Sequence, residues 1–110
     1  IVRLQWEAVT PPGRPAYTVF VHLRQGSQVL AQHDGQPAMG RMPTFAWRPG
    51  EVVLDEHALS LVGVRPGEYT LYTGLYDAAT GQRLPVQDSA GQLVADCEMA
   101  LGAVALGGIE

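Results

Sequence analysis

The tetrapeptide Arg-Pro-Gly-Glu occurs twice, at residues 48–51 and 65–68, and each copy precedes a stretch with β-strand character. Proline presets the φ that the second position of a tight turn needs, and glycine tolerates the positive φ of the third position in a type II turn. Both copies therefore predict a chain reversal that leads into a strand. We expect Gly50 and Gly67 to hold positive φ.

Alternation of apolar and polar residues predicts strands along most of the chain. The clearest stretches span residues 2–9, 17–23, 28–32, 52–61 and 68–77, and shorter ones span 83–86, 93–95 and 99–106. Frequent turn signals between short strands are typical of an antiparallel sandwich. We therefore predict an all-β protein, an antiparallel β-sandwich of seven to eight strands, over residues 1–106, with a C-terminal tail at 107–110.

Composition limits the kinds of partner. The 110 residues predict one domain, and a net charge of −4 with no basic run argues against a nucleic-acid partner. No apolar run reaches the roughly 20 residues that span a bilayer, so we expect no membrane insertion by this segment. Cys97 is the single cysteine, which excludes an intrachain disulfide and a thiolate metal cluster. Because the chain begins at Ile1, inside a predicted strand, we expect it to be a piece of a larger protein.

The segment 33–47 differs from the rest because glycines and prolines interrupt its pattern while it stays apolar. Long connections of this kind are often binding loops. One interpretation is that Phe45 and Trp47 cover the open edge of the core. The other is that Trp47 or Met39 is exposed and stacks on a ligand.

Asp55 and His57 are the best ionisable pair, since they lie two residues apart on one face of a predicted strand. The carboxylate could orient the imidazole for metal binding or proton transfer, and His22 on a neighbouring strand could complete such a site. Alternatively, the acid and the imidazole neutralise each other on a partly exposed strand face. The chain has no phosphate-binding loop and no nucleophile elbow. We therefore predict no catalytic residue, metal or cofactor, and keep an enzyme using His22, Asp55 and His57 as a third interpretation.

An ordered series of motifs covers the chain from Val2 to about Val104. Its members are residues 17–23, 32–34 with Pro37, 43–44, 47–51, 66–69, 74–77 and 80–84. The series resembles a β-sandwich domain of the carboxyl-terminal region of bacterial polytopic membrane proteins, of the glycosyltransferase type that uses lipid-linked sugars, and of other uncharacterised envelope proteins. The resemblance implies an Ig-like or carbohydrate-module-like sandwich outside the cytoplasmic membrane. It implies no catalytic residues, because the transferase chemistry would belong to the membrane-embedded part.

We therefore predict a non-catalytic, extracytoplasmic module of a larger cell-envelope protein that binds glycan or a neighbouring domain of the parent chain. In a glycan module, aromatic faces carry the contact and nearby polar groups bind the hydroxyls. The candidate residues are Trp6, Trp47, Tyr72 and Tyr76, with Asp34, Arg41 and Asp77 as hydroxyl partners. The alternative is a structural spacer or protein-interaction domain without a small-molecule ligand.

Overall fold

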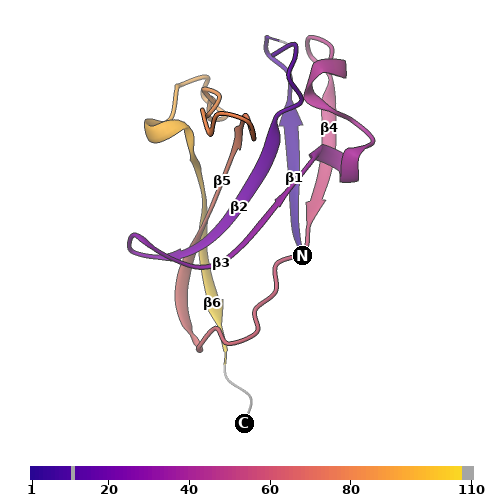
Figure 1. The fold of residues 1–110 in the computed structure, drawn as a ribbon. Helices are drawn as coiled ribbons and strands as arrows, with labels where there is room; N and C mark the ends of the chain where they lie inside the picture. The colour runs from indigo at the N-terminus through magenta and orange to yellow at the C-terminus, as the bar shows by residue number, and fades with distance from the viewer. Residues whose placement is uncertain (11, 108–110) are drawn as a thin grey trace.

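The computed structural model describes residues 1–10 and 12–107, and within them it shows two antiparallel sheets and no α-helix. The smaller sheet pairs β1 (Val2–Glu7) with β4 (Val52–His57). The larger sheet has the order β3-β2-β5-β6, formed by β3 (Gln28–Gly35), β2 (Thr18–Gln25), β5 (Gly67–Tyr76) and β6 (Met99–Leu106). β5 and β6 lie on the far side of β2 from β1 and β4 (Figure 1). The predicted all-β class is confirmed.

The core forms where alternating apolar residues of the two sheets meet. Val19 and Val21 of β2 and Leu75 of β5 pack against Leu4 of β1, and all four are buried. A second cluster joins Ala8, Trp47 and Val53. We call the face of the larger sheet that carries Val19, Val21 and Leu75 its inner face. The residues between them along β2 and β5 point to the outer face, because side chains alternate along a strand.

The described residues form six strands, not the seven to eight predicted. Residues 83–86 and 93–95 make only the isolated bridges Tyr76↔Arg83 and Gln87↔Leu93. The reason is local, since the Asp88 carboxylate accepts hydrogen bonds from the amides of Ala90 and Gln92 and folds this segment into a tight loop. β6 ends at Leu106 as predicted, and residues 108–110 of the predicted tail lie outside the described residues.

The two Arg-Pro-Gly-Glu copies differ in structure. The first is the predicted turn, because the amide of Glu51 donates to the carbonyl of Arg48 at 3.0 Å and Gly50 has φ 78°. The second is not a tight turn: Gly67 opens β5 with φ 158°, and the Tyr69 hydroxyl donates to the Arg65 carbonyl at 2.6 Å. The chain reverses earlier, at 61–64, where Gly63 has φ 81°.

The segment 33–47 is more ordered than its sequence suggests. β3 continues to Gly35, and two short 3₁₀ turns follow, η1 (Pro37–Gly40) and η2 (Thr44–Ala46). Trp47 is only 6% exposed, and its indole Nε1 donates to the Met42 carbonyl at 2.9 Å. Trp47 therefore covers the core. Met39 is 76% exposed, and the Phe45 ring lies under the Arg14 guanidinium at 4.3 Å.

Candidate ligand-binding site

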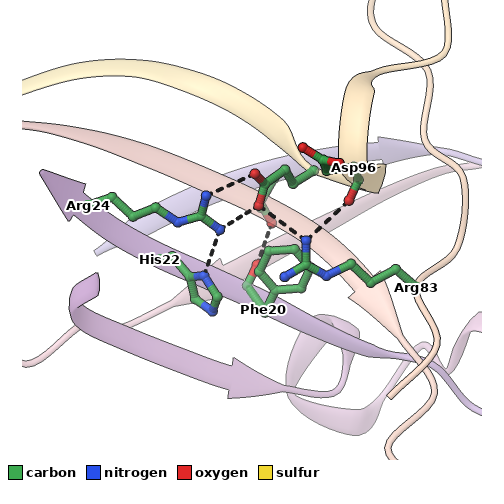
Figure 2. A network of polar contacts seen from close by, with 7 residues as sticks. Phe20, His22, Arg24, Arg83 and Asp96 are labelled. Atoms are coloured by element: carbon green, nitrogen blue, oxygen red, sulfur yellow. Dashed lines mark hydrogen bonds and ion pairs between the residues drawn. The ribbon is translucent and has the colours of Figure 1, made fainter. Parts of the chain in front are cut away.

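A shallow hollow of about 310 Å³ lies on the outer face of the larger sheet. Its lining comes from four parts of the chain: β2, the end of β3, the end of β5 and the turn after β5. The lining residues are Phe20, His22, Asp34, Tyr76, Gly81 and Arg83. We call this feature the outer hollow. Figure 2 shows the polar network on one side of it.

Gly74 makes room for the floor of the hollow. It pairs with Phe20 across β2 and β5, and a Cβ on Gly74 would lie 2.5 Å from the Phe20 ring and 2.7 Å from the Cys97 carbonyl oxygen. Only a residue without a side chain therefore lets the Phe20 ring lie flat across β5. The ring in turn packs against His22, with centroids 4.7 Å apart.

Two arginines and one glutamate form the network on this side. Glu98 accepts hydrogen bonds from both Nη atoms of Arg24, one of them at 2.9 Å, and from Arg83 Nη1 at 3.2 Å. Arg83 Nη1 also donates to the Asp96 carbonyl at 3.1 Å (Figure 2). The hydrogen bond from Arg24 lowers the pKa of Glu98, although burial works against it. The two guanidiniums lie over aromatic rings: Arg83 is 4.5 Å from the Phe20 centroid, and Arg24 is 4.3 Å from that of Tyr72.

The protonation of His22 follows from its neighbour. Its Nδ1 lies 3.0 Å from Arg24 Nη2. Because a guanidinium can only donate, Nδ1 must be the acceptor and the neutral ring carries its proton on Nε2. Burial and then the Arg24 charge lower the pKa of His22, so the ring stays neutral at pH 7.

The opposite side of the hollow offers acceptors. The Tyr76 hydroxyl donates to Asp34 Oδ2 at 2.6 Å, which raises the pKa of Tyr76 and leaves Oδ1 of Asp34 without a bond to any described residue. Asp77 shapes the rim, since its carbonyl accepts from Gly81 N at 2.7 Å and its carboxylate accepts from Ala79 N at 2.9 Å. The hollow therefore has donors from Arg83 and His22 on one side and an acceptor from Asp34 on the other.

Four of the seven predicted binding residues lie at or beside this hollow. Asp34 and Tyr76 line it, Asp77 holds its rim, and Tyr72 lies next along the outer face beneath Arg24. Trp47 is buried elsewhere, and Arg41 follows η1, away from the hollow. Trp6 is half-buried, and its indole Nε1 donates to Asp55 rather than facing solvent.

The sequence interpretation missed Phe20, Arg24, Arg83 and Glu98. The alternation of β2 does place Phe20, His22 and Arg24 on one face, and this was the available signal. The sequence held no signal for Glu98, because the turn η3 (Ala95–Cys97) brings this residue to the arginines. In that turn Asp96 and Cys97 hold φ 57° and 53°.

The Asp55–His57 pair is not on a partly exposed face, as one interpretation had it. The two residues are 1% and 2% exposed, and Asp55 Oδ2 lies 2.7 Å from His57 Nε2. His22 does not join them, since it lies on the outer face; His33 does, with its Nδ1 2.9 Å from His57 Nδ1. Among the described residues, no three His, Cys, Asp or Glu side chains are grouped to hold a metal ion.

Comparison with protein-family models, with curated proteins and with solved structures gives no match to this chain. Within residues 1–10 and 12–107, no helix has the length and apolar character needed to cross a membrane.

Proposed function

We propose that the chain is a non-catalytic accessory module of a larger, extracytoplasmic envelope protein and that it binds a neutral glycan in the outer hollow. The observation that carries the proposal is the placement of fixed donors opposite a fixed acceptor around one hollow. The envelope location is supported by the family resemblance of the sequence. An Ig-like or carbohydrate-module-like sandwich is supported by the core cluster that both sheets share.

The charges around the hollow favour a neutral ligand. The guanidiniums of Arg24 and Arg83 are balanced by the carboxylates of Glu98 and Asp34, so no net charge is left for an ionic ligand. A sugar ring offers hydroxyls that both donate and accept, and an apolar face that packs on an aromatic ring. Arg83 and His22 can donate to one hydroxyl while Asp34 accepts from another, with the half-buried Tyr76 ring beside them.

The same groups favour binding over catalysis. A general acid or base works best with a pKa near the operating pH. In the hollow, the pKa of His22 is lowered and that of Tyr76 is raised, so both residues keep one protonation state near neutrality. They can hold hydroxyls in place but are not poised to exchange protons with them.

The test is an NMR titration of the ¹⁵N-labelled protein with neutral mono- and oligosaccharides. We expect saturable shifts at His22, Asp34 and Tyr76, and at least tenfold weaker binding in Asp34→Asn, which removes the charged acceptor. Tyr76→Phe removes the hydroxyl that orients Asp34 and should weaken binding less. Trp6 and Trp47 lie outside the hollow, so their fluorescence should not change.

Tyr72→Phe is the matched control, because Tyr72 lies on the same face but does not line the hollow. The proposal is wrong if no sugar gives a saturable shift, if Tyr72→Phe weakens binding as much as Tyr76→Phe, or if the shifts lie around Met39 instead.

A second candidate, a protein-interaction module, is favoured by β6. In the described part of the chain this strand is an edge, and residues 99–106 contain neither charge nor proline. Leu101 of β6 is exposed, and an apolar groove of about 420 Å³ lies at the end of this strand. The groove is lined by Leu61, Val64, Pro66, Ala105, Leu106 and Gly107. Such an edge is a template for pairing with another extended segment.

The occupant that fits this edge is an uncharged strand of a neighbouring domain. A synthetic peptide with the sequence 99–106 and flanking solubilising residues serves as the probe. It should bind the wild type and not Ala103→Lys, because a lysine at this exposed position blocks edge pairing. Equal binding to both proteins, or none to the wild type, would remove this candidate.

A further inference from the structure

A buried chain of hydrogen bonds joins the two sheets on the inner side. Asp55 and His57 belong to β4 of the smaller sheet, and His33 belongs to β3 of the larger one. Asp55 Oδ2 lies 2.7 Å from His57 Nε2, and the Nδ1 atoms of His57 and His33 are 2.9 Å apart. The two rings meet edge to face, with centroids 5.0 Å apart. We call this chain of three side chains the histidine clasp.

The carboxylate fixes where the protons lie. Asp55 accepts from Trp6 Nε1 at 3.1 Å and from the Ala38 amide at 2.9 Å. Burial works to raise the pKa of Asp55, but the hydrogen bonds from His57, Ala38 and Trp6 outweigh it and lower that pKa. An ionised Asp55 requires His57 to donate from Nε2, so Nδ1 of a neutral His57 is an acceptor. His33 must then donate from Nδ1.

One end of the clasp is open to a proton. In this arrangement His33 Nε2 carries a lone pair, no described residue bonds it, and it is not sealed from solvent. When a proton binds at Nε2, the Nδ1–H bond of His33 can break as a new N–H bond forms at His57 Nδ1. The imidazolium then lies beside the Asp55 carboxylate, and the clasp changes from a net charge of −1 to zero. This first proton neutralises a buried charge and keeps every hydrogen bond.

A second proton has no place in the clasp. Both imidazoles would then carry N–H on Nδ1, and two donors would face each other at a separation of 2.9 Å. The two imidazolium rings of His33 and His57 would also be cations in contact, and the Asp55 carboxylate could offset only one of the two charges. The bond between the sheets is lost in that state.

Among residues 1–10 and 12–107, no other charged group faces the clasp from the elements around it. The inward neighbours are apolar residues of β1 and β2 and a backbone amide of η1, namely Val2, Leu4, Trp6, Val19, Val21 and Ala38. The charged residues of β1 and β4 lie on the opposite face of their sheet, where Arg3 Nε pairs with Glu56 at 2.7 Å. Asp34 of β3 lies on the outer face with Tyr76. Within the described residues, Asp55 is therefore the charged group that acts on the two histidines, together with solvent.

We infer that the histidine clasp is a proton-binding site that holds the two sheets together with no added proton or with one, and releases them when a second proton binds. The direction of the pH effect on stability follows from the number of protons that the folded and unfolded states bind. The unfolded chain can bind two protons at these histidines while the folded chain holds one, so folding is weakened as the pH falls below about 6, where free imidazoles become charged. Each proton of difference costs up to tenfold in the folded-to-unfolded ratio per pH unit.

The test is urea unfolding between pH 5 and 8 of the wild type and His33→Gln. Glutamine can donate to His57 Nδ1 but cannot be protonated. His22 also disfavours a proton in the folded state, because its pKa is lowered. His22→Gln is therefore the matched control, and His33→Gln is also made in the His22→Gln protein. We expect His22→Gln to retain part of the acid-induced loss of folded protein, and that remainder to shrink by up to tenfold per pH unit when His33→Gln is added in the same background.

The inference is overturned if adding His33→Gln to His22→Gln leaves the acid dependence unchanged. If His33→Gln does not fold, side-chain ¹⁵N NMR of the wild type tests the inference instead. On acidification of the folded protein, His57 must become doubly protonated while His33 stays neutral. A doubly protonated His33 beside a neutral His57 contradicts the proposed proton path.

Discussion

Two buried or half-buried carboxylates, one on each side of the larger sheet, are held by different kinds of partner. Asp55, on the inner side, accepts from three neutral groups of the described residues: an imidazole, an indole and a backbone amide. Glu98, on the outer side, accepts from the guanidiniums of Arg24 and Arg83. Both carboxyl groups have a lowered pKa. The two outer guanidiniums lie against Glu98, and the Asp34 carboxylate across the hollow brings the outer charges into balance. The inner network instead carries a negative charge that a proton on His57 can cancel.

The inner and outer networks differ in how they respond to acid. Arginine stays charged in proteins, so the outer network gives a rigid surface whose donors and acceptors do not change with mild acid. Histidine changes its charge in that range, so the inner network can respond. A binding surface benefits from the first property, and a link between sheets gains pH sensitivity from the second.

The largest expected effect is that of Asp55→Asn, which keeps the shape of the side chain but cannot accept from His57, Trp6 and Ala38 together. At least one buried donor loses its partner, and we expect the free energy of unfolding at pH 7 to fall by about 3 kcal/mol. Glu56→Gln, on the exposed face of the same strand, is the control and should have little effect. Equal losses in the two variants would show that the inner network contributes little.

Gly74→Ala should have the next largest effect, because its Cβ would overlap the Phe20 ring and the Cys97 carbonyl. Overpacking of this kind costs about 2–3 kcal/mol, and the displaced ring should also weaken sugar binding. Thermal unfolding and the sugar titration measure the two effects. Gly107→Ala is the control, since its Cβ would meet nothing within 4 Å. A stable Gly74→Ala protein would show that the floor of the hollow can rearrange.

Glu98→Gln tests the outer network directly. The variant leaves two guanidiniums without their carboxylate in a partly buried position, and we expect a loss of about 1–2 kcal/mol at pH 7. Since the folded-state pKa of Glu98 is lowered, its contribution is present above the ordinary pKa of 4.5 and is lost as the pH falls through the lowered value. Wild type and variant should therefore converge in stability only well below pH 4.5. Convergence already near pH 6 would contradict this assignment.

The smallest effect is expected for Gly35→Ala. A Cβ there would lie 3.2 Å from Cε1 of His33, so the ring must shift by a few tenths of an ångström. We expect a loss of about 1 kcal/mol at pH 8. The lengthened contact between the imidazoles should also weaken the acid response. An unchanged pH profile would show that the clasp tolerates displacement of His33.

Much of the fold could be predicted, because β-strands leave a period of two in the sequence. The alternation of 17–23 and 68–77 located β2 and β5, and Gly50 marked a true turn. The second Arg-Pro-Gly-Glu does not form the predicted tight turn, because Gly67 and Glu68 already pair with Leu106 and Ala105 of β6, and the Tyr69 hydroxyl donates to the Arg65 carbonyl. Such a contact depends on tertiary placement and is invisible in a local pattern.

The sites were harder to predict for the same reason. Asp34 and Tyr76 were named as candidates, but nothing in the sequence showed that they meet across β3, β2 and β5. The sequence pattern offers His22 as the further histidine of the Asp55–His57 pair, because the predicted strand 28–32 leaves His33 in the segment 33–47. In the structure β3 continues to Gly35 and carries His33 to His57 instead. Residues 32–34 are all polar, so the sequence shows no alternation there that would predict an inward-facing side chain for His33.

Neighbouring groups fix the proton positions of all three histidines, and long-range ¹H–¹⁵N NMR of the folded wild type at pH 8 locates each of these protons. We expect His22 and His57 to carry their proton on Nε2 and His33 to carry it on Nδ1. A proton on Nδ1 of His57, or on Nε2 of His33, would contradict the assignment of the clasp. A proton on Nδ1 of His22 would contradict that of the outer hollow.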